Sequence, residues 1–240
     1  MNKTIELQEL FKEWKNRHQS LGKNQFIFDG IVNEARWNAA KPKICFLLKE
    51  SYFDLDDYKN DILLPDNNDV KHHWNRYIAN DDGLYTYDIA RHLKEHKTWF
   101  MWCKVEKWLS SLYQILGMDI DAPIQEIALV NIKKSNGVSR SKDKDILDYA
   151  HMDCDMIRRE LDIIDPDVII CGATYNYCIK ENIFDDVQVI AKLEGFRNRV
   201  VAKSGKRLIL DCYHPAAFTV SYEKIGNYFK AVGPYIHNEE

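Results

Sequence analysis

Four short apolar runs are the clearest pattern in the chain. They cover residues 44–48, 127–132, 168–172 and 207–212. Each run is continuous rather than alternating, which predicts a strand that is buried on both faces. Long stretches separate the runs and leave room for the helical crossovers that parallel strands need.

Helical periodicity lies before, between and after these runs. Apolar side chains recur every three or four positions over residues 4–18, 99–116, 144–164 and 222–232, and residues 173–182 also have a helical pattern. Alternating strands and helices predict a parallel sheet between two helical layers, with right-handed crossovers. We therefore expect an α/β protein built as a three-layer α/β/α sandwich.

Three segments depart from this alternation. Residues 26–31 are aromatic and fit either a strand or a packed loop, and residues 187–190 predict a short extra strand. Residues 53–97 are rich in Asp, Asn and His and have only broken periodicity. We interpret this segment as an insertion within a single domain that spans residues 1–240. So long an irregular segment is typical of a functional lid or binding loop, and a family-specific decoration is the alternative.

Composition limits the class of protein. A chain of 240 residues with 45% hydrophobic and 29% charged residues is typical of one large soluble domain. The formal net charge of −4 gives no overall attraction to nucleic acid, so a positive surface would have to be local.

Cysteine usage and the first residues indicate a compartment. The six cysteines include no Cys-x-x-Cys pair and mostly lie in apolar runs, which favours buried thiols in a reducing compartment. The chain starts without an apolar signal region, and no stretch is long enough to span a membrane. These features predict a cytoplasmic protein.

Polar side chains follow three of the predicted strands. Glu50 follows the first run, Asn131 lies in the second, and His214 follows the last and precedes Pro215. The carboxyl ends of parallel strands meet at one edge of a sheet, where α/β proteins bind ligands. A carboxylate could orient or deprotonate a water, an amide could read a heterocycle edge, and an imidazole could donate to a leaving group. Structural interpretations remain open: a lysine partner for Glu50, a turn cap for Asn131 and a packing role for His214.

The strand ends resemble the motifs of the uracil-DNA glycosylase superfamily. In chain order these are an acidic turn at Lys49-Glu50-Ser51-Tyr52, an Asn-x-x-Lys at residues 131–134, Pro-Asp-Val-Ile-Ile-Cys-Gly-Ala at 166–173, and Tyr-His-Pro-Ala-Ala at 213–217. The last two are most similar to the thermophile-type, iron–sulfur branch. The resemblance covers residues 43–52, 127–137, 165–174 and 207–219.

The resemblance implies a fold and a reaction. It implies a central four-stranded parallel sheet of order 2-1-3-4 and cleavage of the N-glycosidic bond of a flipped-out uracil. By position, Glu50 would place the attacking water, Asn131 would read the uracil, and His214 would stabilise the departing uracil anion.

Further positions follow from the same resemblance. Phe218 would be the wedge that enters the vacated base stack, and Trp99 or Phe100 would stack on the base. Tyr52 would lie beside the base, as a filter against a 5-methyl group or as a block to the pocket. Lys133 and Lys134 begin a basic cluster that continues with Arg140, Lys142 and Lys144. This cluster would bind DNA phosphates, or it is a solvated loop.

The chain also departs from the family pattern. Lys49 replaces a glycine, and the four cluster cysteines are missing, with Ser135 where one is expected. We therefore expect no iron–sulfur cluster, no other cofactor and no bound metal. Adjacent His72 and His73 point apart on a helix, so we interpret them as surface residues rather than metal ligands.

These features predict a monomeric base-excision enzyme that removes uracil or a related damaged base from DNA. Two alternatives remain. One is a non-catalytic member of the same fold that binds nucleic acid or a protein partner, and the other is an enzyme that acts on free nucleotides. A pocket filled by Lys49 or Tyr52 would favour the non-catalytic protein.

Overall fold

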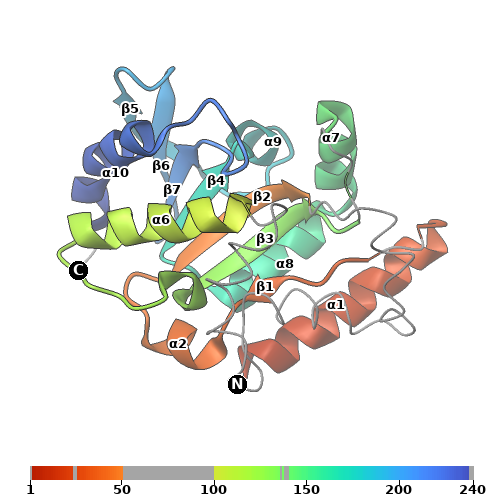
Figure 1. Cartoon of the computed structure of the whole chain (residues 1–240). Helices are drawn as coiled ribbons and strands as arrows, with labels where there is room; N and C mark the ends of the chain where they lie inside the picture. The colour runs from red at the N-terminus through yellow and green to blue at the C-terminus, as the bar shows by residue number, and fades with distance from the viewer. Residues whose placement is uncertain (1, 24–25, 51–99, 136, 138–140, 238–240) are drawn as a thin grey trace.

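The structure is a computed structural model that describes residues 2–23, 26–50, 100–135, 137 and 141–237. Its centre is one twisted sheet with strand order β1-β3-β2-β4-β7-β6-β5 (Figure 1). The strands are β1 Gly30–Ile31, β2 Ile44–Glu50, β3 Ile127–Lys133, β4 Val168–Gly172, β5 Gln188–Leu193, β6 Arg199–Ser204 and β7 Arg207–Cys212.

The middle of the sheet is parallel and its edges are antiparallel. Strands β3, β2, β4 and β7 run parallel to one another in that order. Strand β1 pairs antiparallel with β3, and β6 and β5 extend the other side as antiparallel strands. The sheet therefore has seven strands among the described residues rather than the expected four. The four continuous apolar runs form its parallel centre.

Helices cover both faces of this sheet (Figure 1). One layer contains α6 (Phe100–Ile115) and α10 (Tyr222–His237). The other contains α1 (Lys3–Ser20), α7 (Asp143–Met152), α8 (Cys154–Ile164) and α9 (Tyr175–Lys180). A short helix, α2 (Glu34–Ala39), and a 3-10 helix, η2 (Pro123–Glu126), complete the described elements.

Alternate residues of each central strand face opposite layers. In β2, Phe46 and Leu48 pack with the α6 and α10 side chains, whereas Cys45 and Leu47 pack with those of α1 and α8. This period of two also decides the direction of every polar residue at the strand ends.

The segment predicted as one helix over residues 144–164 is two helices. Asp153 lies at the junction of α7 and α8, and its carboxylate is 2.8 Å from Nε2 of His18 on α1. Both of these side chains are fully buried. The helical spacing on each side of the break is intact, so the sequence pattern gave no sign of it.

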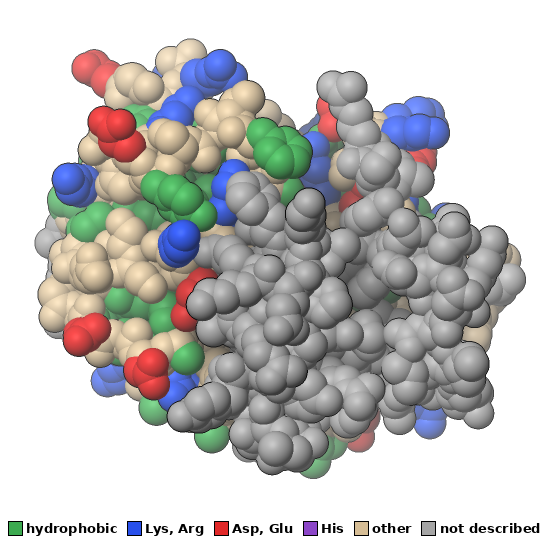
Figure 2. Space-filling model, in the orientation of Figure 1, with side chains coloured by type: hydrophobic (Ala, Val, Ile, Leu, Met, Phe, Trp, Pro, Cys, Tyr) green, Lys and Arg blue, Asp and Glu red, His purple; other side chains and the backbone are tan. Residues whose placement is uncertain are grey.

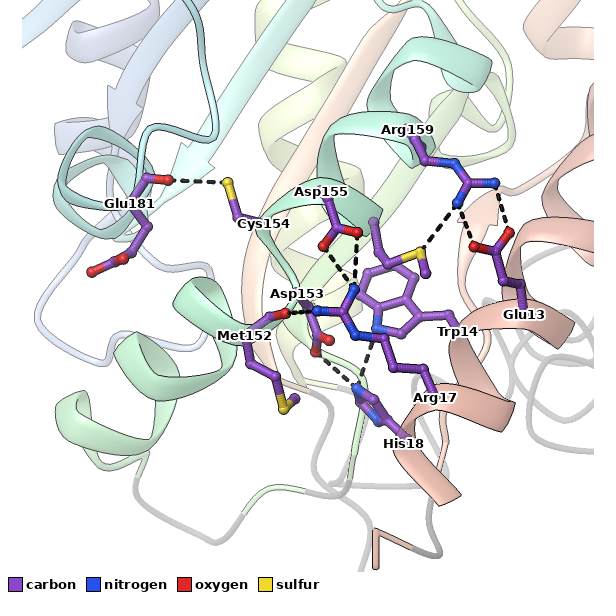
Figure 3. A network of polar contacts seen from close by, with 11 residues as sticks. Glu13, Trp14, Arg17, His18, Met152, Asp153, Cys154, Asp155, Arg159 and Glu181 are labelled. Carbon is purple, nitrogen blue, oxygen red and sulfur yellow. Dashed lines mark hydrogen bonds and ion pairs between the residues drawn. The ribbon is translucent and has the colours of Figure 1, made fainter. Parts of the chain in front are cut away.

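Helix α1 is held against α8 by a network of polar contacts (Figure 3). Arg159 makes two 2.7 Å hydrogen bonds with the carboxylate of Glu13, and Arg17 donates to both oxygens of Asp155 at 2.8 and 2.9 Å. The indole of Trp14 lies 3.2 Å from Nε2 of His18. The apolar face of α1 buries Leu7, Leu10, Phe11 and Trp14.

No helix of the described chain is both long enough and apolar enough to cross a membrane.

Candidate active site

Strands β2 and β3 bring three polar side chains to one edge of the sheet. Leu48 pairs with Asn131 and Glu50 pairs with Lys133 in the parallel register. At these strand ends the Nζ atom of Lys133 reaches α7, where it lies 3.5 Å from Oδ2 of Asp145 and 5.5 Å from the centre of the Tyr149 ring. The register puts Glu50 and Asn131 on neighbouring strands, two positions apart.

Glu50 is held in an ion pair. Its Oε2 accepts a 2.8 Å hydrogen bond from Nζ of Lys133, and the two side chains are only 4% and 7% exposed. Oε1 has no hydrogen-bond partner among the described residues. Burial alone would lower the pKa of Lys133, but the hydrogen bond and charge of Glu50 reverse this and raise it. Lys133 therefore stays cationic beside Glu50, and one of the two carboxyl oxygens is used by this pair.

Gly137 packs against the Glu50 carboxyl group. A Cβ atom at position 137 would lie 2.4 Å from Cδ of Glu50, which is too close for any side chain. The loop after β3 therefore passes directly beside the carboxylate and helps to fix its position.

Asn131 is almost completely buried and is oriented by Asp29. The Asn131 backbone N–H donates to Oδ2 of Asp29 at 2.7 Å, and the Asn131 side-chain Nδ2 donates to the same oxygen at 3.1 Å. Asp29 precedes β1 and is 1% exposed.

His214 follows β7, the last of the parallel strands, and the next residue, Pro215, packs over the end of β4. A Cβ atom on Gly172 at the end of β4 would lie 3.4 Å from Cδ of Pro215 and 2.6 Å from Cδ2 of Leu48. Glycine at this position therefore lets Leu48 and Pro215 both pack against the end of β4.

The imidazole of His214 is neutral and has a defined tautomer. Its Nδ1 accepts a 3.1 Å hydrogen bond from the backbone N–H of Ala216. Because that N–H can only donate, the ring proton lies on Nε2. Burial, and secondarily the nearby charge of Lys49, lower the pKa of His214 to about 4.

Lys49 does not occupy the face that carries Glu50 and Asn131. Its Nζ lies 3.3 Å from Oδ1 of Asp143 and 5.3 Å from the centre of the Tyr177 ring, toward α7 and α9. Lys49 was one of two residues that would favour a non-catalytic protein if they filled the pocket; its side chain points toward α7 and α9, and Tyr52, the other, lies outside the described residues.

Lys134 does not fit its expected role in phosphate binding. The side chain is fully buried and pairs with Asp29 and with Glu160, whose Oε1 is 3.0 Å from Nζ. Lys133 is also buried, in its pair with Glu50. A phosphate cannot reach Lys134 without unfolding this part of the protein. Both lysines therefore pair with buried carboxyl groups and are not presented to a phosphate at the surface.

The remaining basic cluster is balanced by acidic side chains. Lys144 is exposed and pairs with Asp148 at 2.8 Å, and Asp143 and Asp145 lie in the first turn of α7. Over the described part of the face in Figure 2, acidic and basic side chains are interspersed. Arg140 lies outside the described residues.

Phe218 lies on the surface, four residues after His214. Its side chain is 89% exposed, the largest value among the large apolar side chains of the described residues. Its loop is held by Nζ of Lys104, which donates to the carbonyl of Ala217 at 2.8 Å. The expected wedge position is therefore surface-exposed and adjacent to the site.

The other predicted residues fall at or beyond the limits of the description. Phe100 is the first residue of α6. Tyr52, Trp99, His72, His73 and the segment 53–97 lie outside the described residues. Within the described ranges, no group of three or more His, Cys, Asp or Glu side chains is placed to hold a metal ion.

Two buried carboxyl groups were missed from the sequence. Asp29 interrupts the aromatic segment 26–31, and Glu160 lies on the apolar face of α8 between Ile157 and Leu161. A charged residue at an otherwise apolar position was the available signal for both.

A search with the sequence finds no matching protein-family model and no matching curated protein.

Proposed function

We propose that this protein is a DNA glycosylase that hydrolyses the N-glycosidic bond of uracil or a related damaged base. The observation that carries this proposal is the neutral His214, whose proton lies on Nε2 at the sheet edge that also presents Glu50 and Asn131.

His214 suits the stabilisation of an anionic leaving group. When the bond from the sugar to the base breaks, the electron pair stays on the base and negative charge develops on its oxygen. A fixed N–H donor aimed at this oxygen stabilises the transition state more than the ground state. The hydrogen bond from Ala216 fixes His214 as such a donor.

Glu50 suits the other half of the reaction. The sugar becomes positively charged as the base departs, and an ionised carboxylate stabilises that charge. Lys133 holds one oxygen of Glu50 at 2.8 Å, and the second can orient the water that adds to the sugar. The water proton can pass to this carboxylate as the new C–O bond forms.

The strand order and the surface support the same proposal. Strands β3, β2, β4 and β7 form the parallel centre of the sheet, and such a centre supports the fold that the motif resemblance implies. The exposed Phe218 favours nucleic acid over a free nucleotide, because an apolar wedge is useful only where a base stack has to be opened.

The test is release of uracil from labelled single-stranded and double-stranded oligonucleotides. The wild type is compared with Glu50→Gln and His214→Ala. The matched controls are Glu13→Gln and His151→Ala, whose side chains are 52% and 82% exposed, away from the sheet edge. We expect release by the wild type and both controls, with loss in both site variants.

Two outcomes would contradict the proposal. If no uracil is released from either oligonucleotide at any enzyme concentration, uracil is not the substrate. If other damaged bases in the same oligonucleotides are also retained, glycosylase activity itself is excluded.

A further inference from the structure

One ammonium and two hydroxyl groups meet beside the candidate active site. The phenol oxygen of Tyr149, on α7, lies 2.9 Å from Oγ of Ser135, in the segment after β3. Nζ of Lys23, which follows α1, donates to the same phenol oxygen at 3.1 Å. Three segments that are far apart in the sequence therefore converge on one oxygen atom.

Hydrogen-bond donors outnumber acceptors in this cluster. The Lys23 ammonium can only donate, and the hydroxyl groups of Ser135 and Tyr149 share one hydrogen bond with each other. Whichever hydroxyl donates, one hydroxyl hydrogen is left without an acceptor among the described residues. The remaining hydrogens of Lys23 likewise have no described acceptor. A positively charged cluster with surplus donors is complementary to an anion.

The acidic groups nearby are paired with a different lysine. The carboxyl groups of Glu50 and Asp145 lie 2.8 and 3.5 Å from Nζ of Lys133. Lys133 is 5.5 Å from the centre of the Tyr149 ring, and Lys23 is 4.3 Å from it. Two ammonium groups therefore lie near the ring, and within the described ranges only that of Lys23 has no carboxylate partner.

The Tyr149 hydroxyl is held in place and is still accessible. The Tyr149 ring packs against the fully buried imidazole of His18, with ring centroids 5.8 Å apart and an angle of 64° between the planes. Ser135 is buried, whereas Tyr149 and Lys23 are half-buried. A ligand can therefore reach Tyr149 and Lys23 from solvent, and donors that are already fixed lose less entropy when it binds.

We propose that Lys23, Ser135 and Tyr149 form a binding site for a phosphate group. A phosphate ester is ionised at neutral pH and its free oxygens only accept hydrogen bonds, so it takes up the surplus donors of the cluster. Lys133 connects this site to the candidate active site, because its ammonium pairs with Glu50 and lies near Tyr149. Which phosphate binds rests on the proposed function: it is a phosphate beside the target sugar, in a nucleic-acid strand or in a free nucleotide.

The test measures phosphate binding without base release. The isotope-labelled ring of Tyr149, assigned by comparison with Tyr149→Phe, is followed in NMR spectra at constant ionic strength. The probes are inorganic phosphate, deoxyuridine monophosphate and a single-stranded oligonucleotide without uracil, with deoxyuridine as the uncharged control. We expect the ring signals to shift saturably with each phosphate-bearing probe and to stay unchanged with deoxyuridine.

The order of the affinities identifies the source of the phosphate. Saturation at a lower concentration of the oligonucleotide than of the monophosphate, which we expect, assigns the site to a nucleic-acid backbone. The reverse order assigns it to a free nucleotide.

Variants test the two accessible donors. In Lys23→Met we expect about tenfold weaker oligonucleotide binding, and a slope of log K against log salt that is smaller by about 0.7, as for one charge on a single strand. Tyr149→Phe keeps the ring and removes the hydroxyl, so binding should weaken about fivefold with an unchanged slope. Lys12→Met, at an exposed position of α1, is the control and should change neither quantity.

Two results would overturn the proposal. One is a Tyr149 signal that no phosphate-bearing probe moves, and the other is equal affinity and salt slope in the wild type and Lys23→Met. Failure of the glycosylase proposal is a separate result. A protein that binds these probes but releases no base keeps the phosphate site, whereas base release without any shift at Tyr149 refutes the phosphate site alone.

Discussion

The carboxylate of Glu50 and the ammonium of Lys133 lie 2.8 Å apart at positions that face each other across two neighbouring parallel strands. Because the pair is built on the sheet itself, the candidate water-positioning group sits on the most rigid part of the fold. A site carried by strands is held more accurately than one carried by loops.

Removal of Lys133 should destabilise the protein. Lys133→Met leaves the carboxylate of Glu50 buried without its partner, and we expect a loss of about 3 kcal/mol in the free energy of unfolding. Urea denaturation of the variant measures this, with Lys144→Met as the exposed control at below about 0.5 kcal/mol. The double variant Glu50→Gln with Lys133→Met should regain part of the loss. A change below about 1 kcal/mol for Lys133→Met would show that Glu50 is hydrated.

A methyl group at position 137 should displace Glu50. Gly137→Ala places a carbon 2.4 Å from the Glu50 carboxyl carbon, so we expect loss of base release and about 1–3 kcal/mol of destabilisation. The matched control is Gly226→Ala in α10, where the nearest atom to the new methyl group is 3.8 Å away. There we expect unchanged activity and a gain of up to about 1 kcal/mol. Equal effects of the two substitutions would show that Gly137 does not help to position Glu50.

Two amides can separate the functions of the two His214 nitrogens. In His214→Asn the shorter side chain can replace the acceptor Nδ1 and loses the distal donor. In His214→Gln the amide N–H can reach the position of Nε2. We expect a loss of about 10²-fold in base release for Asn and a smaller loss for Gln. A larger loss of base release for Gln than for Asn would show that the acceptor contact with Ala216, and not the N–H donor at the position of Nε2, is required for base release.

His214 should stay neutral well below the pH at which an ordinary histidine gains a proton. Its pKa is about 4, so base release should be insensitive to its titration between pH 8 and 5 and should fall only near pH 4. Lys49→Met removes the smaller of the two causes and should raise the pKa part of the way toward 6.5. An NMR titration of the ring checks both values. A wild-type midpoint near 6.5 would contradict the burial of this ring.

The pH dependence of stability should contain two opposing contributions. The unfolded state binds more protons at His214 between pH 4 and 6.5, so this group makes stability rise with pH. Burial raises the pKa of Glu106 from 4.5 to about 6, so the folded state binds more protons there and stability falls with pH. Glu106→Gln should therefore steepen the rise between pH 4.5 and 6.5 by at most about 2 kcal/mol. Urea unfolding at three pH values measures it, and an unchanged slope would refute the shift at Glu106.

The parallel centre of the sheet could be predicted because strands that are buried on both faces form continuous apolar runs in the sequence. Of the antiparallel strands beyond β7, β5 coincides with the extra strand predicted over residues 187–190, whereas β6 was not predicted. Val189 and Ile190 of β5 are 51% and 41% exposed, and β6 is a short strand between charged residues. Such edge strands are defined by the strand beside them rather than by their own pattern.

The strand ends predicted a candidate site but not which of its side chains would be accessible. Lys134 looked like a phosphate ligand because it stands in a run of basic residues. Its partners, Asp29 and Glu160, are 105 and 26 residues away in the sequence. Asp153, at the junction of α7 and α8, likewise contacts His18, which is 135 residues away. Long-range pairing of this kind leaves no local pattern.

Helix α1 has a consequence for the centre of the protein. The Lys134 ammonium lies 5.4 Å from the centre of the Phe11 ring and 5.1 Å from that of Trp14, so α1 forms the wall that keeps water from Lys134, Asp29 and Glu160. A protease cut between α1 and β1 that released the helix would expose these three charged side chains to water. The eighteen residues of α1 are therefore part of the barrier that keeps the three charged side chains dry, and a shortened version of the protein has to retain them.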